Sequence, residues 1–289
     1  MASSGAPVGD LTQPLSPVRT AFEVGMTFLA GLFTLVAVVP LLLVLIYVLT
    51  QGFAALSPEV FFRLPTPAGT PGGGFGNAIQ GTALMVTIAV LISVPFGVLS
   101  GIFLSEYARD TQLVQAIRFG VNVLAGVPSI VIGVFAYGVV VAGQGFSAWA
   151  GGFALAILML PIIVRTTEES LKLVPWELRL ASLGLGANRF DTIARVVVPA
   201  ALPGMITGVM LAVSRAAGET APLLFTALFS QYWLEGLNKP TASLAVLIFN
   251  YATTPYEDLQ QKAWGASLLL LLLVLVISVT ARFVFRRRL

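Results

Sequence analysis

The sequence predicts an all-α membrane protein with six transmembrane helices. Hydrophobic residues make up 57% of its 289 residues and charged residues only 10%, whereas about a quarter of the residues in a soluble domain are charged. Apolar runs long enough to cross a bilayer as a helix, about 20 residues, recur along the chain. Together these observations exclude an ordinary soluble domain.

The predicted spans follow one another at short intervals. Five of them carry no charge, and the fifth in chain order carries two. The apolar stretch 244–252 is too short to cross a bilayer, so we expect an interfacial or re-entrant piece there. The six predicted spans are residues 26–49, 78–104, 119–142, 146–164, 196–229 and 263–281.

The remaining segments divide the chain into a short leading part and a membrane domain. Residues 1–20 are rich in Ser, Pro and Gly, a composition that predicts a mobile segment. Residues 21–289 form the transmembrane domain. Its first span is too long for the apolar region of a cleaved signal peptide.

The distribution of basic residues predicts the orientation. Twelve of the 16 Lys and Arg residues flank the spans on one side and three lie on the other, while Arg215 lies within the fifth span. Because Lys and Arg accumulate in cytoplasmic loops, both termini and the long loop at about 166–195 are predicted to be cytoplasmic.

The composition also excludes several kinds of chemistry. The chain has no cysteine and no histidine, so it lacks disulfides, thiol chemistry and the usual metal ligand and general base. We therefore predict no catalytic residue, no metal site and no cofactor. No basic face for nucleic-acid binding is visible either.

Two charged residues, Arg215 and Glu219, lie inside the otherwise apolar segment 196–229. An ionisable residue within a membrane span is energetically unfavourable and by default marks a pathway or a site. The spacing of four predicts that both side chains lie on one face of a helix. The alternative is a structural ion pair between helices.

Glycine and proline positions within the spans predict close packing and kinks. Gly97 with Gly101, and Gly204 with Gly208, form two G-x-x-x-G pairs, which allow helix backbones to approach closely. Prolines interrupt the helical hydrogen bonding and tend to kink a helix. They occur within the spans at positions 95, 128, 161 and 222.

The long loop contains a predicted amphipathic helix from Glu177 onward. Apolar and charged residues alternate there at roughly helical spacing, and Gly186 followed by Ala187 and Asn188 is expected to break or turn the helix. Such a helix can lay its apolar face in a groove of a partner protein, or it can lie on the membrane surface.

The loop resembles the "EAA" motif of ABC importer permeases, in which a Glu-Ala-Ala triplet precedes a glycine and a proline. Leu180, Ala181 and Ser182 take the positions of the triplet, Gly186 that of the glycine and Pro199 that of the proline. Leucine thus replaces the glutamate, and serine the second alanine, which removes any salt bridge that the glutamate would make.

The fifth span restricts the resemblance to one group of these permeases. Gly218-Glu-Thr-Ala-Pro-Leu-Leu-Phe-Thr-Ala-Leu228 resembles the A-type permease subunits of bacterial phosphate importers, as do Gly126–Gly133, Leu160–Glu169 and the Asn77–Thr82 entry to the second span. The resemblance extends from about Gly74 to the C-terminus.

This resemblance implies a type I ABC importer permease in the bacterial inner membrane that works by alternating access. A related C-type permease subunit would complete a heterodimer, two copies of a cytoplasmic ATPase would drive it, and a periplasmic binding protein would deliver inorganic phosphate. The chain has no phosphate-binding loop of its own, so a partner would hydrolyse ATP and this subunit is no enzyme. The expected ATPase-coupling residues are Ala181, Ser182, Gly186, Ala187, Asn188, Arg189 and Phe190.

With this resemblance, Arg215, Glu219 and Arg165 become the expected substrate path. The planar guanidinium matches two oxygens of a phosphate. Glu219 can pair with Arg215 while the path is empty, and it can accept a hydrogen bond from a protonated phosphate oxygen. Arg165 is expected at the inner end of the path, and its alternative role is an interfacial anchor.

Two other functions compete with the permease. A stand-alone ion-coupled anion carrier would have internal repeats and more carboxylates within the membrane. An intramembrane enzyme without Cys or His would need Ser–Lys or paired-carboxylate chemistry, but the predicted spans contain no lysine and only one carboxylate.

Overall fold

The computed structural model describes residues 17–70, 72–108 and 111–286, the last six of them as backbone only. The chain separates into two compact units, residues 1–49 and 50–289. The first unit is most of helix α1 (Pro17–Ala55), which contains the predicted first span and has Pro40 inside it. Most of the predicted mobile segment, residues 1–16, lies outside the described residues, and residues 17–20 already belong to α1.

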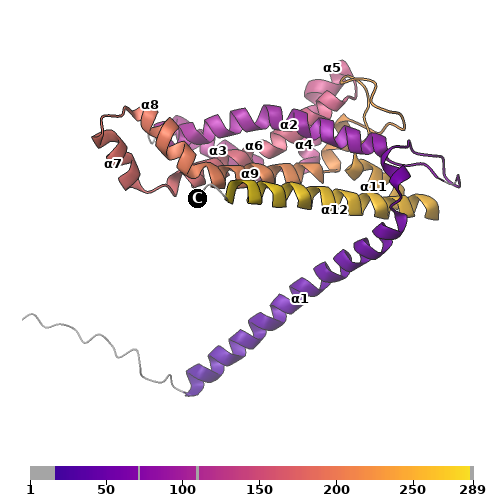
Figure 1. Cartoon of the computed structure of the whole chain (residues 1–289), viewed down its shortest axis with the longest axis horizontal. Helices are drawn as coiled ribbons and strands as arrows, with labels where there is room; N and C mark the ends of the chain where they lie inside the picture. Colours follow the sequence, from indigo (N-terminus) through magenta and orange to yellow (C-terminus); the bar gives the residue numbers. More distant parts are fainter. Residues whose placement is uncertain (1–16, 71, 109–110, 287–289) are drawn as a thin grey trace, which may run out of the picture. The chain divides into compact units, whose positions relative to one another are not determined.

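In its described part, the regular secondary structure of the second unit is all helical, and loops connect the helices (Figure 1). After a 3₁₀ turn at Pro58–Phe61, long helices alternate with short ones, and three π-helical turns occur at Phe103–Tyr107, Tyr137–Val141 and Ile193–Val197. The helices are α2 (Gly76–Ile102), α3 (Gln112–Gly126), α4 (Ser129–Ala136), α5 (Ala142–Gln144), α6 (Ala148–Lys172), α7 (Trp176–Gly184), α8 (Arg189–Thr192), α9 (Val198–Ala217), α10 (Ala221–Thr226), α11 (Leu244–Ala252) and α12 (Glu257–Arg286).

Five described helical runs are long and apolar enough to cross a membrane, and α3 with α4 and α5 make a sixth if a bent pair is one span. They correspond to the six predicted spans. Helix α11 begins and ends at the limits predicted for the short apolar piece, 244–252.

Helix α6 is the centre of the second unit. It packs between α2 and α9, and its buried residues Leu155, Met159 and Ile163 meet Met85 of α2 and Ala212 of α9 in one apolar core. In Figure 1 these long helices run side by side with α12, with α7 and α8 at one end of the bundle and α11 at the other.

Both predicted glycine pairs pack against α6. A Cβ added at Gly101 would lie 2.6 Å from Cβ of Thr167, and one added at Gly204 would lie 2.5 Å from Oγ of Ser170. Gly97 and Gly208 meet Ile163 and Thr166 at similarly short range. Because no real Cβ fits at such distances, glycine is what lets α2 and α9 approach α6, as the motif predicts.

The end of the bundle at α11 has its own core. Phe75, Leu244 and Leu247 are buried there together with residues of α12. The backbone N–H of Leu244 donates to Oγ1 of Thr82 at 2.8 Å. These contacts bury the short helix α11 against the long helices α2 and α12 instead of leaving it peripheral.

The predicted third span is sharply bent at Pro128, where the sequence predicts a kink. Helices α3 and α4 are separated at Val127 and Pro128, both in extended conformation, and the chain bends there by 105°. Proline lacks a backbone N–H and disfavours the helical conformation of the residue before it. Val127 therefore ends the helix, and Pro128 serves as the N-cap of the next one.

The predicted fifth span, 196–229, is also broken. Helix α9 ends at Ala217, and the separate helix α10 begins at Ala221 with Pro222 in its first turn. Proline is well accommodated in a first turn, where the N–H that it lacks would have no helical partner. The result is a turn, Gly218–Thr220, within the apolar segment.

Candidate functional site

Arg215 and Glu219 form an ion pair across the end of α9. Nε of Arg215 lies 3.3 Å from Oε1 of Glu219. The prediction that one helix carries both residues is wrong, because α9 ends between them. The chain keeps turning after the helix, since the N–H groups of Gly218 and Glu219 donate to the carbonyls of Arg215 and Ala216 at 3.1 and 3.3 Å. This tighter turn keeps Glu219 within reach of Arg215.

The pair is asymmetric in exposure. The Arg215 side chain is 51% exposed in this chain and that of Glu219 only 17%, while the next two residues, Ala216 and Ala217, are buried. Arg215 continues an exposed strip of α9 that includes Thr207 and Leu211. The guanidinium therefore lies on a face of α9 that the rest of the second unit leaves uncovered.

The turn beside the pair is fixed from two sides. Oγ1 of Thr220 donates to the carbonyl of Ala245 on α11 at 3.4 Å. On the other side, a Cβ at Gly133 of α4 would lie 2.7 Å from Cα of Pro222, so α4 and α10 are in backbone contact. The two broken segments thus meet next to the charged pair, and α11 supports the turn.

Arg165 lies elsewhere. Its Nε donates to Oδ1 of Asn122 on α3 at 3.0 Å, and its Nη2 contacts the same oxygen. Thr166 of α6 faces Gly208 of α9, so at 1.5 Å per residue Arg215 is about 10 Å further along the axis. The structure does not bring Arg165 together with the Arg215–Glu219 pair.

A small charged cluster surrounds Arg165. Arg118 and Lys172 both pair with Oε1 of Glu168, at 2.9 and 2.6 Å. These residues line a cavity of about 300 Å³ together with Asn122. Two of the cations share the single charge of Glu168. With Arg165 and Glu169, three cations and two carboxylates line the cavity, so the cluster keeps a positive charge.

The predicted helix of the long loop and its break at Gly186 are confirmed. Helix α7 contains Ala181 and Ser182 and ends before Gly186, whose φ of 87° favours glycine. The N–H of Gly186 donates to the carbonyl of Leu183 at 3.0 Å, and that of Ala187 to the carbonyl of Ser182 at 3.2 Å. These two bonds are the Schellman arrangement that ends helices at glycine.

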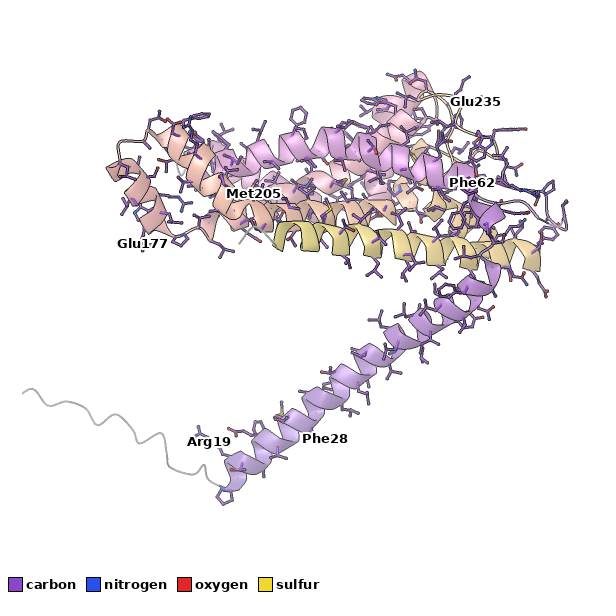
Figure 2. All side chains as sticks on the ribbon, viewed as in Figure 1. Arg19, Phe28, Phe62, Glu177, Met205 and Glu235 are labelled. Atoms are coloured by element: carbon purple, nitrogen blue, oxygen red, sulfur yellow. The ribbon has the colours of Figure 1, made fainter. Side chains whose placement is uncertain are left out.

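The next residues start a second short helix. The Asn188 side chain caps α8 by accepting from the N–H of Asp191 at 2.8 Å, and Arg189 and Phe190 follow as its first residues. The Phe190 ring is exposed, as are Leu173, Trp176 and Leu185. Figure 2 shows Glu177 of α7 at one end of the second unit, with Phe62 and Glu235 at the opposite end.

The inner side of this loop contains two residues that sequence reasoning missed. Arg179 of α7 and Glu106 of the π-helical turn after α2 form an ion pair at 2.8 Å, with side chains only 11% and 10% exposed. They line a cavity of about 710 Å³ between the loop and the bundle. The two residues are 73 positions apart, and no pattern in the sequence relates them.

Comparison with known proteins places the chain in a family. The family model "Binding-protein-dependent transport system inner membrane component" matches residues 93–288. The chain is 42% identical to the phosphate transport system permease protein PstA of Yersinia pestis over 93% of this chain and 90% of that protein. It is 37% identical to PstA 1 of Mycobacterium tuberculosis strain H37Rv, over 96% of each chain.

Solved structures share the fold at low sequence identity. A chain of the MetNI methionine ABC transporter, in an inward-facing conformation, matches with a TM-score of 0.57 and 20% identity over 73% of this chain and 93% of that one. A chain of a bacterial alginate ABC transporter matches with a TM-score of 0.65 and 13% identity over 93% and 96%. The fold is thus that of ABC importer permeases. From the family model and the level of identity together, we conclude that the chain belongs to the binding-protein-dependent transport system inner membrane components, and within them to the PstA permease proteins.

Proposed function

We propose that this chain is the membrane-spanning permease subunit through which inorganic phosphate crosses a bacterial inner membrane, as half of the translocation path of an ATP-driven importer. Membership of the family makes it the multi-pass membrane component of a transporter that also contains an ATPase and a binding protein. Phosphate is the substrate named for the relatives. Residues 21–289 are then the permease domain, with both termini in the cytoplasm.

One observation carries the proposed path: the half-exposed guanidinium of Arg215 lies on a face of α9 that the other helices of the second unit do not cover. A charged side chain facing hydrocarbon is unfavourable by about 3 kcal/mol at the centre of a helix. The face therefore borders a protein or a water-filled path. A second, C-type permease subunit opposite this face would enclose such a path between the two chains.

The chemistry of the pair suits a phosphate ion. The guanidinium fork can donate to two phosphate oxygens. While the path is empty, the carboxylate of Glu219, at 3.3 Å, compensates the charge of Arg215, which prevents the site from holding an anion too tightly. Arg165 would contact the anion nearer the loop end of the bundle, after exchanging its bond to Asn122.

The loop 166–195 is the proposed contact of this subunit with the ATPase, two copies of which would drive the importer. Its exposed apolar residues, among them Phe190 and Leu185, lie beside the Gly186 turn and suit a groove of a partner. ATP binding would bring the loops of the two permeases together and open the path outward, and hydrolysis would reverse it. The proposed ATPase-facing residues are Ala181, Ser182, Gly186, Ala187, Asn188, Arg189 and Phe190.

Reconstitution tests this function. The chain is combined in liposomes with its C-type partner, the ATPase and the phosphate-binding protein, and uptake of radioactive phosphate is followed with ATP inside. We expect ATP-dependent uptake that Arg215→Gln abolishes without loss of the ATPase from the complex. Arg63→Gln, which removes one charge from an exposed pair with Glu59, is the control and should import normally.

Two outcomes contradict the proposal. Normal uptake by the Arg215→Gln complex would remove Arg215 from the path. Uptake by this chain alone, driven by an ion gradient without the ATPase, would instead identify a stand-alone ion-coupled carrier.

A further inference from the structure

Helix α7 is attached to the bundle in an unusual way. None of its nine residues, all of them described, is buried, so no apolar side chain of α7 anchors it in a core. Its Arg179 side chain nevertheless points inward and is 11% exposed. The attachment of α7 therefore depends on polar contacts: those of this arginine to the bundle, and the hydrogen bond between the hydroxyls of Ser182 and Thr192, at 2.9 Å, to α8.

Arg179 donates hydrogen bonds from both terminal nitrogens of its guanidinium. Nη2 donates to Oε1 of Glu106 at 2.8 Å and to the carbonyl of Leu171 at 2.9 Å. Nη1 donates to the carbonyl of Val174 at 2.6 Å, and the guanidinium carbon lies 5.9 Å from the centre of the Trp176 ring. One side chain thus connects α7 to the end of α6 and to the residues that follow α2.

Glu106 also binds the second helix of the loop, α8. Arg189, in the first turn of α8, donates to the backbone carbonyl of Glu106, and its guanidinium carbon lies 5.2 Å from the centre of the Tyr107 ring. Carbonyls at a helix end lack helical partners and carry partial negative charge, so they attract cations. Both loop helices, α7 and α8, are therefore bonded to one residue.

The position of Glu106 connects the loop helices to the transmembrane bundle. Glu106 lies in the π-helical turn Phe103–Tyr107 that continues α2, and α2 packs along the full central helix α6. Oγ of Ser105 donates to the same carboxylate oxygen at 3.2 Å, which fixes its orientation. Single π-helical turns occur frequently at functional sites.

We propose that Glu106 and Arg179 are positioning residues that transmit movement of the ATPase-facing loop to α2 and the transmembrane bundle. The proposal rests on the proposed function, since it assigns the route by which the ATPase moves this subunit. A buried pair loses its compensation when one partner is removed, so α7 would lose its link to α2 while the outer, ATPase-facing residues of the loop stay intact. ATP hydrolysis would then continue, but less phosphate would be imported for each ATP hydrolysed.

The test measures transport per ATP in the reconstituted complex. Glu106→Gln and Arg179→Gln are compared with the double variant, and Glu59→Gln, which breaks the exposed pair at the other end of the bundle, is the matched control. We expect each single variant to keep the ATPase bound and active but to lower phosphate imported per ATP about fivefold or more. The double variant should be no worse than either single one, because both changes remove the same link.

A covalent cross-link in place of the Glu106–Arg179 pair distinguishes loss of this link from general damage to the fold. The chain contains no cysteine, so Glu106→Cys with Arg179→Cys, in a complex with cysteine-free partners, provides two unique thiols. Joining them with a short bis-methanethiosulfonate linker should restore transport per ATP, and reduction should abolish it again.

Three results would overturn the positioning role: unchanged transport per ATP in both single variants, additive losses in the double variant, or a linked double-cysteine complex that stays uncoupled. Failure of the proposed function is recognised separately, because the unmodified complex would then not import phosphate at all.

Discussion

Arg215 and Glu219 remain paired at 3.3 Å although helix α9 ends at Ala217, between them. The pair therefore spans a helix end and not a helix face. One partner is half exposed and the other nearly buried, and the turn that holds Glu219 is supported by the bond from Thr220 to Ala245. A small movement of this turn would change the distance between the charges, so the pair can respond to movement of the bundle.

Replacing Glu219 by glutamine should weaken discrimination between phosphate and sulfate. The carboxylate can accept a hydrogen bond from a protonated phosphate oxygen, and sulfate has no such proton at neutral pH. In the Glu219→Gln complex we expect sulfate to compete with phosphate uptake about tenfold more strongly, the equivalent of one charge-assisted hydrogen bond of about 1.4 kcal/mol. Glu235→Gln, in the loop between α10 and α11, is the control, and unchanged competition in Glu219→Gln would remove Glu219 from selectivity.

A charge reversal at Arg189 should break the contact of the loop with Glu106 and weaken binding of the ATPase. The side chain donates to the carbonyl of Glu106 and lies over the Tyr107 ring, and a glutamate there would face a carbonyl oxygen without a donor. We expect Arg189→Glu to reduce ATPase retention in the purified complex, measured by the ratio of subunits, and to abolish uptake. If both remained at the level of the unmodified complex, Arg189 would have no part in coupling.

The turn at Gly186 should not tolerate a branched side chain. Its φ of 87° lies in the left-handed region, where a residue with a Cβ is less stable by roughly 1–2 kcal/mol. Gly186→Val should therefore distort the loop and lower ATPase retention, while Gly184→Ala, where an added Cβ meets nothing within 4 Å, should not. Equal retention in both variants would contradict this account.

Gly81 should be the most sensitive of the packing glycines. A Cβ there would overlap the backbone carbonyl of Ala242, which cannot rotate away as a side chain can. We expect Gly81→Ala to destabilise the protein by about 1–3 kcal/mol, visible as a lower melting temperature in detergent. Gly120→Ala, with open space around its Cβ, should leave the melting temperature unchanged or slightly raised, and equal behaviour of the two variants would refute the packing argument.

The sequence by itself determined the class, the number of spans and several local features. Helix α11 has the predicted limits 244–252, and the loop helix ends where Gly186 predicts. Both G-x-x-x-G pairs make the close contacts expected of them. These features depend on local composition and backbone preference, which a single segment carries within itself.

Only the tertiary structure decided where the helices break and which charges meet. Apolar composition continues through Pro128 and Gly218, so counting uncharged residues could not separate a kinked span from two helices bent by 105°. The bond of Arg165 to Asn122 and the Glu106–Arg179 pair join residues 43 and 73 positions apart. Such contacts arise from the packing of α2, α3 and α6 with the loop. A buried charge needs a partner, and the packing of the folded chain determines which residue lies close enough to be that partner.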